Sequence, residues 1–209
     1  MYKKSFVFAA IVVVALAASP AMAQAPDNFS FFVTSENPGD GANFGGLAGA
    51  DAHCQSLAAA VGAGGKTWRA YLSSSTPLVH ARDRIGAGPW FNINGVQVAA
   101  NVGDLHYNTL NLSKANSLTE LGGTVNGVGD TPNQHDILTG TNPDGTSSGA
   151  NCENWTANGE GSATVGHLDR VGGGAMASSW NAAHASRGCS NELLAASGGG
   201  GYYYCFSID

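Results

Sequence analysis

The sequence is poor in charged residues, and in basic residues above all. Among its 209 residues, 11% are charged, with 9 Lys and Arg against 15 Asp and Glu, and the formal net charge is −6. The usual charged fraction is about 25%. Proteins that bind nucleic acid, heparin-type polyanions or anionic membranes need clustered Lys and Arg. We therefore expect neither a nucleic acid nor a heparin-type polyanion as the partner.

Sequence motifs of two large enzyme classes are missing as well. The chain has no His-Glu-x-x-His segment and no Gly-x-x-x-x-Gly-Lys phosphate loop, which mark zinc peptidases and nucleotide-binding enzymes. Carboxylates are plentiful, but no spacing singles out an acid–base pair. We therefore predict that the protein is not an enzyme.

Long apolar runs are confined to the start of the chain. Two lysines precede an apolar stretch at 5–18, and a small-x-small cleavage site ends at Ala23. The stretch is shorter than the roughly 20 residues needed to span a bilayer. We predict a signal peptide over residues 1–23 and a single domain over residues 24–209. The protein is then bacterial, secreted or periplasmic, with no membrane insertion after the signal peptide is cleaved.

The four cysteines lie far apart in the sequence. Cys54, Cys152, Cys189 and Cys205 include no Cys-x-x-Cys pair, so they do not indicate a zinc site or a thioredoxin-like redox pair. In an oxidising compartment four cysteines indicate two disulfides, and the sequence allows three pairings. We expect structural disulfides and no catalytic thiol.

The hydrophobic pattern predicts an α+β domain. Apolar residues at helical spacing over 49–61 predict an amphipathic helix with Leu57 buried against a sheet, and the glycines that follow end this helix. Segments rich in aromatic and β-branched residues predict strands. The predicted strands are 29–34, 67–73, 151–156, 164–169 and 202–208, and a short helix is expected over 77–85.

The middle of the chain has little regular pattern. Residues 86–149 are mostly Gly, Asn, Asp and Thr with brief apolar pieces. A loop region of this length is unusual in a compact domain and is often functional. The whole chain holds 30 Gly, but its 8 Phe, 6 Tyr and 4 Trp can build a core, so the composition does not indicate a disordered protein.

Five short segments, in order along the chain, resemble one known family. They are 45–54 (GGLAGADAHC), 67–74 (TWRAYLSS), 82–84 (RDR), 140–145 (GTNPDG) and 152–155 (CENW), followed by Cys189 and Cys205. These segments resemble those of endostatin, the C-terminal domain of collagen types XV and XVIII. The resemblance runs from about residue 29 to the C-terminus.

The resemblance implies a C-type-lectin-like fold. Such a fold is α+β, with small antiparallel sheets, one or two helices, a long Gly- and Asn-rich loop region and two nested disulfides. The family pattern implies the pairs Cys54–Cys205 and Cys152–Cys189. In the chain-entropy model the inner pair would contribute about 3–4 kcal/mol to stability.

One segment of the loop region is similar to a sugar site. In sugar-binding C-type lectins a Glu-Pro-Asn-type motif and a later Trp-Asn-Asp motif hold calcium, and sugar hydroxyls complete its shell. This chain has a similar pattern at 142–144 (NPD) and 180–181 (WN), but Ala182 replaces the final Asp. The alternative is a plain turn at 142–145, in which the side chains bond locally. A calcium site would use oxygens of Asn142, Asp144, Glu153 and Asn181.

Two tryptophans are candidates for direct contact with a sugar. Trp180 belongs to the second lectin-like segment, and Trp90 follows Gly88 and Pro89. Their flat faces could stack on a sugar ring. The alternative is that a tryptophan in such a loop is a buried anchor.

The histidines allow a metal hypothesis. His106 with Asp104, and His135 with Asp136 and Asp130, offer imidazole and carboxylate donors. No two histidines have the His-x-x-x-His spacing of a helical metal site. The zinc sites of the endostatin family use N-terminal histidines, which are missing here after residue 23. The alternative is that these side chains hydrogen-bond the backbone of loops.

Two kinds of function therefore remain. We expect an exported, non-catalytic binding module of lectin-like fold that recognises a glycan or an extracellular protein, with calcium as a candidate cofactor. The alternatives are a structural or interaction protein without a sugar site, and an enzyme on a lectin-like fold. The oxidases of related architecture that modify sulfatases need free cysteines. The four cysteines of this chain are expected to form disulfides, which disfavours that kind of enzyme. The missing carboxylate at Ala182 favours an interaction protein, whereas loops rich in Asn, Asp, Gly and Trp favour a glycan.

Overall fold

The structure is a computed structural model that describes residues 1, 24–108, 111–173 and 176–209. The predicted cleavage site, at the end of residues 2–23, lies outside the described residues. Within the described ranges, no helix combines the length and the apolar character needed to cross a membrane.

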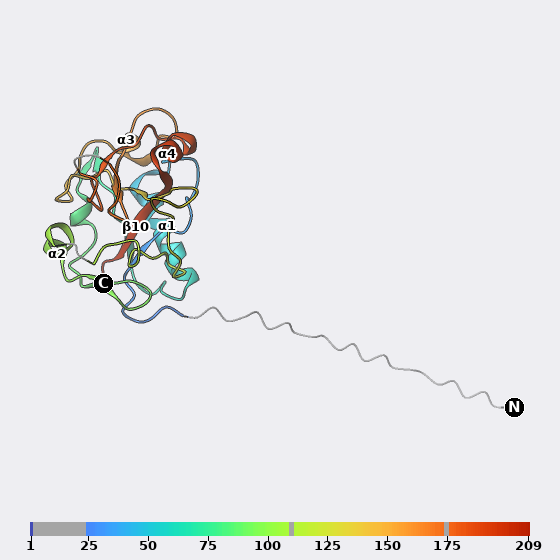
Figure 1. The fold of residues 1–209 in the computed structure, drawn as a ribbon. Helices are drawn as coiled ribbons and strands as arrows, with labels where there is room; N and C mark the ends of the chain where they lie inside the picture. Colours follow the sequence, from blue (N-terminus) through green and yellow to red (C-terminus); the bar gives the residue numbers. More distant parts are fainter. Residues whose placement is uncertain (2–23, 109–110, 174–175) are drawn as a thin grey trace.

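A six-stranded sheet forms the centre of the protein, and β10 is its longest strand (Figure 1). One edge of β10 pairs with β1. Along its other edge, the first part of β10 pairs with β7 and the last part pairs with β2. The β10–β7 pair is parallel and the other pairs are antiparallel. The strand order is β1 (Phe31–Val33), β10 (Gly199–Ser207), β7 (Asp136–Leu138), β8 (Thr164–His167) and β9 (His184–Ala185), and β2 (Trp68–Ala70) pairs with β10.

Short elements surround this sheet. Two small hairpins lie outside it, and four helices and one 3₁₀ turn are found in the described residues. The hairpins are β3 (Ser74–Ser75) with β4 (Leu78–Val79), and β5 (Trp90–Phe91) with β6 (Gln97–Ala99). The helical elements are α1 (Gly46–Ala60), η1 (Ala81–Asp83), α2 (Val102–Tyr107), α3 (Cys152–Trp155) and α4 (Asn191–Ser197).

Both faces of the central sheet are buried. Side chains of a strand alternate between the two faces, and along β10 Tyr203 and Cys205 belong to one hydrophobic cluster while Tyr204 and Phe206 belong to another. The first cluster includes the buried face of α1, and the second includes Trp90 and Trp180 from the loop side. The strand predicted over 202–208 is thus confirmed, with a core on each side of it.

Helix α1 matches the predicted helix but begins three residues earlier. It runs from Gly46 to Ala60, and Gly62 follows with a positive φ of 80°. Ala50, Asp51, Cys54 and Ala58 face the core. Leu57 packs against the core, as predicted, although its side chain is only partly buried.

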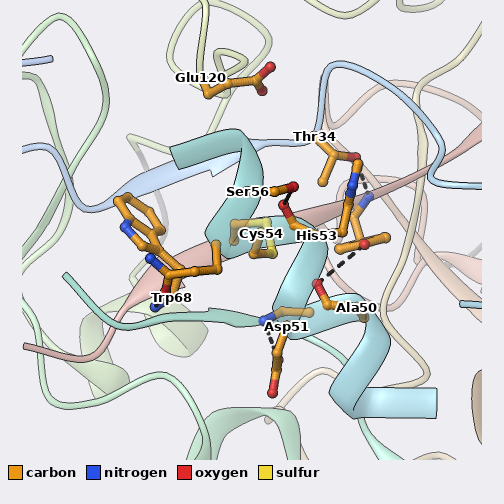
Figure 2. The surroundings of a disulfide bond; sticks show 12 residues. Thr34, Ala50, Asp51, His53, Cys54, Ser56, Trp68 and Glu120 are labelled. Atoms are coloured by element: carbon orange, nitrogen blue, oxygen red, sulfur yellow. Dashed lines mark hydrogen bonds between the residues drawn. A yellow bond between two sulfur atoms is a disulfide. The ribbon is translucent and has the colours of Figure 1, made fainter. Parts of the chain in front are cut away.

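The two disulfides are nested as the family resemblance implied. Cys54 of α1 bonds Cys205 of β10, and Cys152 bonds Cys189, with Cα–Cα separations of 5.7 Å in both. Figure 2 shows the first bond between α1 and the sheet, with Trp68 and Asp51 nearby. The described residues include no free cysteine.

Three details of the predicted fold are corrected. The strand predicted over 151–156 is a single helical turn, α3, in which Cys152 to Trp155 all have positive φ. Long-range contacts impose this turn, because Cys152 is tied to Cys189 and the indole of Trp155 donates to the Ser73 carbonyl at 2.6 Å. The sheet is mixed rather than antiparallel, and the described residues form four helices rather than one or two.

Candidate functional site

A hollow opens between helix α2 and the turn at 142–146. Its volume is about 590 Å³. We call it the loop-face hollow. Charged side chains contribute to its wall, and Tyr107, which is 76% exposed, also lines it. The residues that define it are Arg82, Asp83, Val102, His106, Tyr107 and Asp144.

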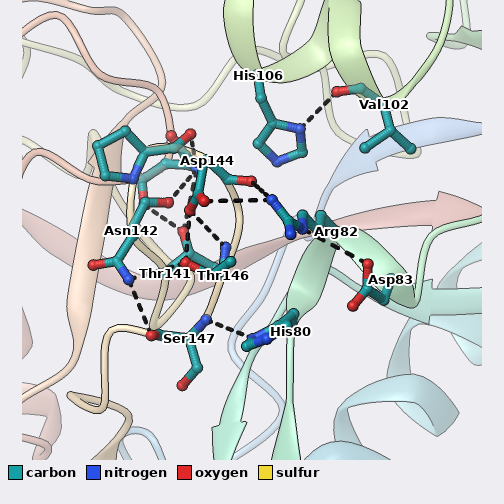
Figure 3. A network of polar contacts seen from close by, with 12 residues as sticks. His80, Arg82, Asp83, Val102, His106, Thr141, Asn142, Asp144, Thr146 and Ser147 are labelled. Atoms are coloured by element: carbon teal, nitrogen blue, oxygen red, sulfur yellow. Dashed lines mark hydrogen bonds and ion pairs between the residues drawn. The ribbon is translucent and has the colours of Figure 1, made fainter.

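Arg82 and Asp144 form the charged pair of this hollow. The Arg82 guanidinium donates to the backbone carbonyl of Asp144 at 3.2 Å and to its Oδ2 at 3.3 Å (Figure 3). Both side chains are about one-third to two-fifths exposed. The pair therefore offers both a donor and an acceptor to a polar ligand at the surface.

The sequence Asn-Pro-Asp-Gly forms a turn that fixes Asp144. Its Oδ1 accepts hydrogen bonds from the Thr146 hydroxyl at 2.6 Å and the Thr146 N–H at 3.0 Å. The amide of Asn142 donates to Thr146 Oγ1 and to the Ser147 carbonyl. The Thr146 hydroxyl first, then its N–H and the nearby Arg82, hold the pKa of Asp144 below its usual value. Asp144 is thus a carboxylate at neutral pH.

A buried chain of hydrogen bonds supports the turn from behind. The Asn181 amide donates to the carbonyls of Asn142 and Pro143 at 3.1 and 3.2 Å and to the Tyr71 hydroxyl at 3.1 Å. Tyr71 Oη lies 2.7 Å from His106 Nε2. His106 Nδ1 lies 2.7 Å from the Val102 carbonyl, which can only accept. Nδ1 therefore donates, and the neutral ring accepts from Tyr71 at Nε2.

Burial sets the protonation of this chain. Burial lowers the pKa of His106 and raises that of Tyr71, so both groups are neutral near pH 7. Asn181 is 1% exposed. Together these side chains connect α2, β2 and the 142–146 turn, and hold the wall of the loop-face hollow in place.

A smaller hollow of about 170 Å³ lies next to the first and shares His106 with it. Pro143, Trp180 and Asn181 contribute to its lining. The two lectin-like segments of the sequence, 142–144 and 180–181, therefore do lie side by side. The two segments thus belong to one face of the protein.

The geometry does not support the predicted calcium site on that face. Asn181 is buried, and its amide nitrogen holds the backbone of the turn. Both oxygens of Asp144 have partners, and the partner of Oδ2 is the positive charge of Arg82. A guanidinium against the carboxylate opposes a second cation there. The alternative weighed from the sequence, a locally bonded Asn-Pro-Asp-Gly turn, describes what is found.

Of the other predicted ligand residues, Trp90 and Glu153 line neither hollow, and Trp180 is almost fully buried at the wall of the smaller one. Trp90 is 1% exposed, and its indole donates to the Ser207 carbonyl, so it is a buried anchor. Trp180 is 3% exposed and packs against Tyr71 and Tyr204. Glu153 is exposed on α3 and lines neither hollow. The exposed aromatic ring on this face is that of Tyr107, which the sequence did not single out.

A serine motif lies beside the turn and was overlooked in the sequence. Residues 145–149 (GTSSG) fit the Gly-x-Ser-x-Gly pattern of hydrolases. That pattern is functional when the serine sits between a strand and a helix, whereas Ser147 lies in a short bridge with Thr141 and no helix follows directly. His80 accepts from the Ser147 backbone N–H, and no hydrogen bond joins it to the hydroxyl. The motif therefore does not form a nucleophile–base pair.

The predicted metal-ligand candidates divide into two groups. Asp104 accepts from backbone and side-chain donors next to α2, His106 belongs to the buried chain, and Asp130 pairs with Lys114. His135 and Asp136, in contrast, lie together with His167 and His184, which the sequence analysis missed. No local signal marks the last two, because they are brought to Asp136 by strand pairing.

Comparison with known proteins assigns no family. No protein-family model matches the chain, and no curated protein matches it. The two disulfides are compatible with an extracellular or periplasmic location.

Proposed function

We propose that the chain is an exported, non-catalytic binding module of C-type-lectin-like fold. Its ligand is a glycan, bound in the loop-face hollow without calcium. The observation that carries this proposal is the meeting of Arg82, Asp144 and the exposed ring of Tyr107 around one hollow of about 590 Å³.

The chemistry of this hollow suits a polyhydroxylated ligand. Sugar hydroxyls both donate and accept, so a carboxylate and a guanidinium side by side can each take one. The apolar face of a sugar ring fits against an aromatic ring whose hydroxyl stays in water, as that of Tyr107 would. A few fixed polar groups in a concave wall are the usual design of a small-ligand site.

The charges around the hollow disfavour a polyanion. Asp83 and Asp144 flank Arg82, and the chain carries a formal charge of −6. A neutral glycan avoids the repulsion that a sulfated or phosphorylated chain would meet. The ligand is therefore expected to be uncharged.

A rigid wall would favour affinity for such a ligand. The Asn181–Tyr71–His106 chain fixes the turn and α2 before a ligand arrives. Binding to a preformed site avoids the cost of ordering side chains and loops. The lectin-like topology inferred from the sequence would place such a site in the long loop region.

A glycan array with purified mature protein tests the proposal. Retention of neutral glycans should be equal in calcium and in chelator. Asp144→Asn keeps the acceptor for Thr146 but removes the charge, and Tyr107→Ala removes an exposed ring; both should weaken retention. Asp27→Asn, at an exposed position away from the hollow, is the matched control and should bind as the unaltered protein does.

Three results would count against this function. They are no retained glycan in either buffer, retention that requires calcium, and retention that persists unchanged in both hollow variants. Capture of an extracellular protein in place of a glycan would favour the interaction-protein alternative.

A further inference from the structure

A group of three histidines and one aspartate lies at one end of the central sheet. We call it the histidine cluster: His135, Asp136, His167 and His184. Asp136 begins β7 and faces His167 of β8 in the strand register, and His184 of β9 faces Val165. None of the four lines the loop-face hollow, so the cluster is independent of the proposed function.

The three histidine rings converge on one oxygen atom of Asp136. Asp136 Oδ1 lies 3.4 Å from His135 Nε2, 3.3 Å from His167 Nε2 and 3.4 Å from His184 Nε2. Around a zinc ion with bonds of about 2.0–2.1 Å, tetrahedral ligand atoms lie about 3.3–3.4 Å apart. The ligand atoms of His135, Asp136 and His167 all lie within 4.8 Å of one another.

The centre of the cluster is buried and lacks partners. Asp136 is 1% exposed, and neither of its carboxylate oxygens has a hydrogen-bond partner. Nε2 of His167, itself 1% exposed, has none either. Buried polar groups in folded proteins are nearly always satisfied, and an uncompensated buried carboxylate is costly. A cation between these atoms would satisfy all of them.

The second ring nitrogen of each histidine, Nδ1, lies within hydrogen-bond distance of an acceptor oxygen. Nδ1 of His135 lies 2.9 Å from Asp169 Oδ1, and Nδ1 of His167 lies 2.8 Å from the Ala177 carbonyl. Nδ1 of His184 lies 3.0 Å from the carbonyl of the next residue. Carbonyl and carboxylate oxygens only accept, so each Nδ1 donates. In neutral rings every Nε2 then carries a lone pair, 3.3–3.4 Å from Asp136 Oδ1.

Lone pairs this close to a carboxylate repel it unless a cation lies between them. The cation is either a proton on an imidazole or a metal ion. Histidines that bind metals regularly donate their other ring N–H to a carboxylate or a backbone carbonyl, which fixes the tautomer. The histidine cluster has this arrangement at all three rings.

We propose that the histidine cluster binds one divalent transition-metal ion, with zinc as the expected metal. His135, His167 and Asp136 supply the buried ligands, and His184, whose side chain is 38% exposed, closes the site on the solvent side. Imidazole ligands select zinc, copper or nickel over calcium. The ion would join β7, β8 and β9 at the edge of the sheet. Segment 176–181, between β8 and β9 in the sequence, contributes to the lining of the smaller hollow.

Gly172 shows how closely the chain covers this site. A Cβ at this position would lie 2.9 Å from His167 Cε1 and 3.6 Å from His135 Cε1, and its φ is +143°. A side chain there would press on the His167 ring and contact the His135 ring. The absence of one leaves the imidazoles room to keep their positions.

Zinc titration of untagged, chelator-treated mature protein tests the site. We expect one zinc per chain, a higher melting temperature with zinc because the ion binds only the folded state, and no such effect of calcium. Loss of a residue that only hydrogen-bonds a metal ligand lowers metal affinity by about 10–100-fold. Asp136 is itself a proposed ligand, so Asp136→Asn should weaken zinc binding by at least that factor.

A second variant and a control keep the test independent of folding. His184→Ala alters a partly exposed side chain and should also weaken zinc binding, whereas His80→Ala removes a histidine outside the cluster and should leave it unchanged. The proposal fails if zinc does not bind the unaltered protein, which would leave protonated histidines as the partners of Asp136. It also fails if Asp136→Asn and His184→Ala, both folded, bind zinc as tightly as the unaltered protein.

Discussion

Arg84 holds Asp51 across the interface between helix α1 and the sheet. Arg84 Nη2 lies 2.7 Å from Asp51 Oδ2 and 2.8 Å from Oδ1, and the two side chains are 11% and 10% exposed. Asp51 Oδ1 also accepts from the Ala70 N–H at 2.9 Å, and Arg84 donates to the Ala70 carbonyl. The pair thus joins α1, β2 and the chain after η1 in one buried polar junction.

Asp51→Ala should strongly destabilise the protein. It leaves the guanidinium of Arg84 nearly buried without a counter-charge, and breaking a buried pair in this way costs about 3–5 kcal/mol. Chemical denaturation measures the change in the free energy of unfolding. Asp83→Ala, with an Asp side chain that is 65% exposed, is the control and should cost no more than about 1 kcal/mol. Equal effects of the two changes would contradict the structural role of the pair.

The outer disulfide should contribute more stability than the inner one. Cys54–Cys205 closes a separation of 151 residues and Cys152–Cys189 one of 37. In the chain-entropy model the longer loop is worth about 1 kcal/mol more, and either bond contributes about 2–5 kcal/mol. Unfolding of the two double Cys→Ala variants tests this order. Peptide mapping of unreduced protein should find both pairs, and a Cys54–Cys152 peptide would contradict the fold.

The Tyr71 hydroxyl should stabilise the wall of the loop-face hollow. Tyr71→Phe leaves His106 Nε2 without its donor and deprives the Asn181 amide of one acceptor. Such unsatisfied buried groups cost about 1–3 kcal/mol. Denaturation would measure the loss, and glycan retention should fall with it because the wall loosens. A change below about 0.5 kcal/mol with unchanged retention would show that the chain does not support the hollow.

The lowered pKa of Asp144 leads us to expect a specific dependence of the protein's stability on pH. Its pKa is lowered in the folded protein, chiefly by the Thr146 hydroxyl. The ionised group therefore stabilises the fold above the unfolded pKa of about 3.9, and this contribution is lost as the pH falls through the lower folded pKa. Asp144→Asn should be less stable than the unaltered protein near neutral pH, and the difference should vanish in acid. A difference that grew as the pH fell would contradict the assignment.

Local sequence patterns were sufficient to locate the helix and the strand that hydrophobic periodicity marks. The spacing of Ala50, Cys54 and Ala58 located α1, and the alternation along β10 located the terminal strand. The disulfide pairing was different, because four cysteines alone allow three pairings and only the family resemblance selected one. Hydrophobic periodicity placed Leu57 on the core side, but it could not show that a carboxylate, Asp51, would be buried there against an arginine.

Long-range pairing explains what the sequence could not provide. Cys152 to Trp155 form a left-handed turn because a disulfide and a buried indole fix both its ends. His135 and Asp136 are neighbours in the sequence, but His167 and His184 join them only through the register of β7, β8 and β9. Asp144 of the 142–144 motif lines the loop-face hollow, whereas Arg82 and Tyr107 reach the same hollow from separate elements that no sequence motif connects.

The central claim is that a neutral glycan occupies the loop-face hollow, and a backbone-amide NMR titration with the best array ligand tests it most directly. The account predicts that chemical-shift changes concentrate at residues 82–87, 102–107 and at Asp144, which contain the lining of the hollow. The changes should be the same in calcium and in chelator. Changes concentrated at another surface, such as residues 132–134 and 195–200 around a second hollow, would contradict the claim.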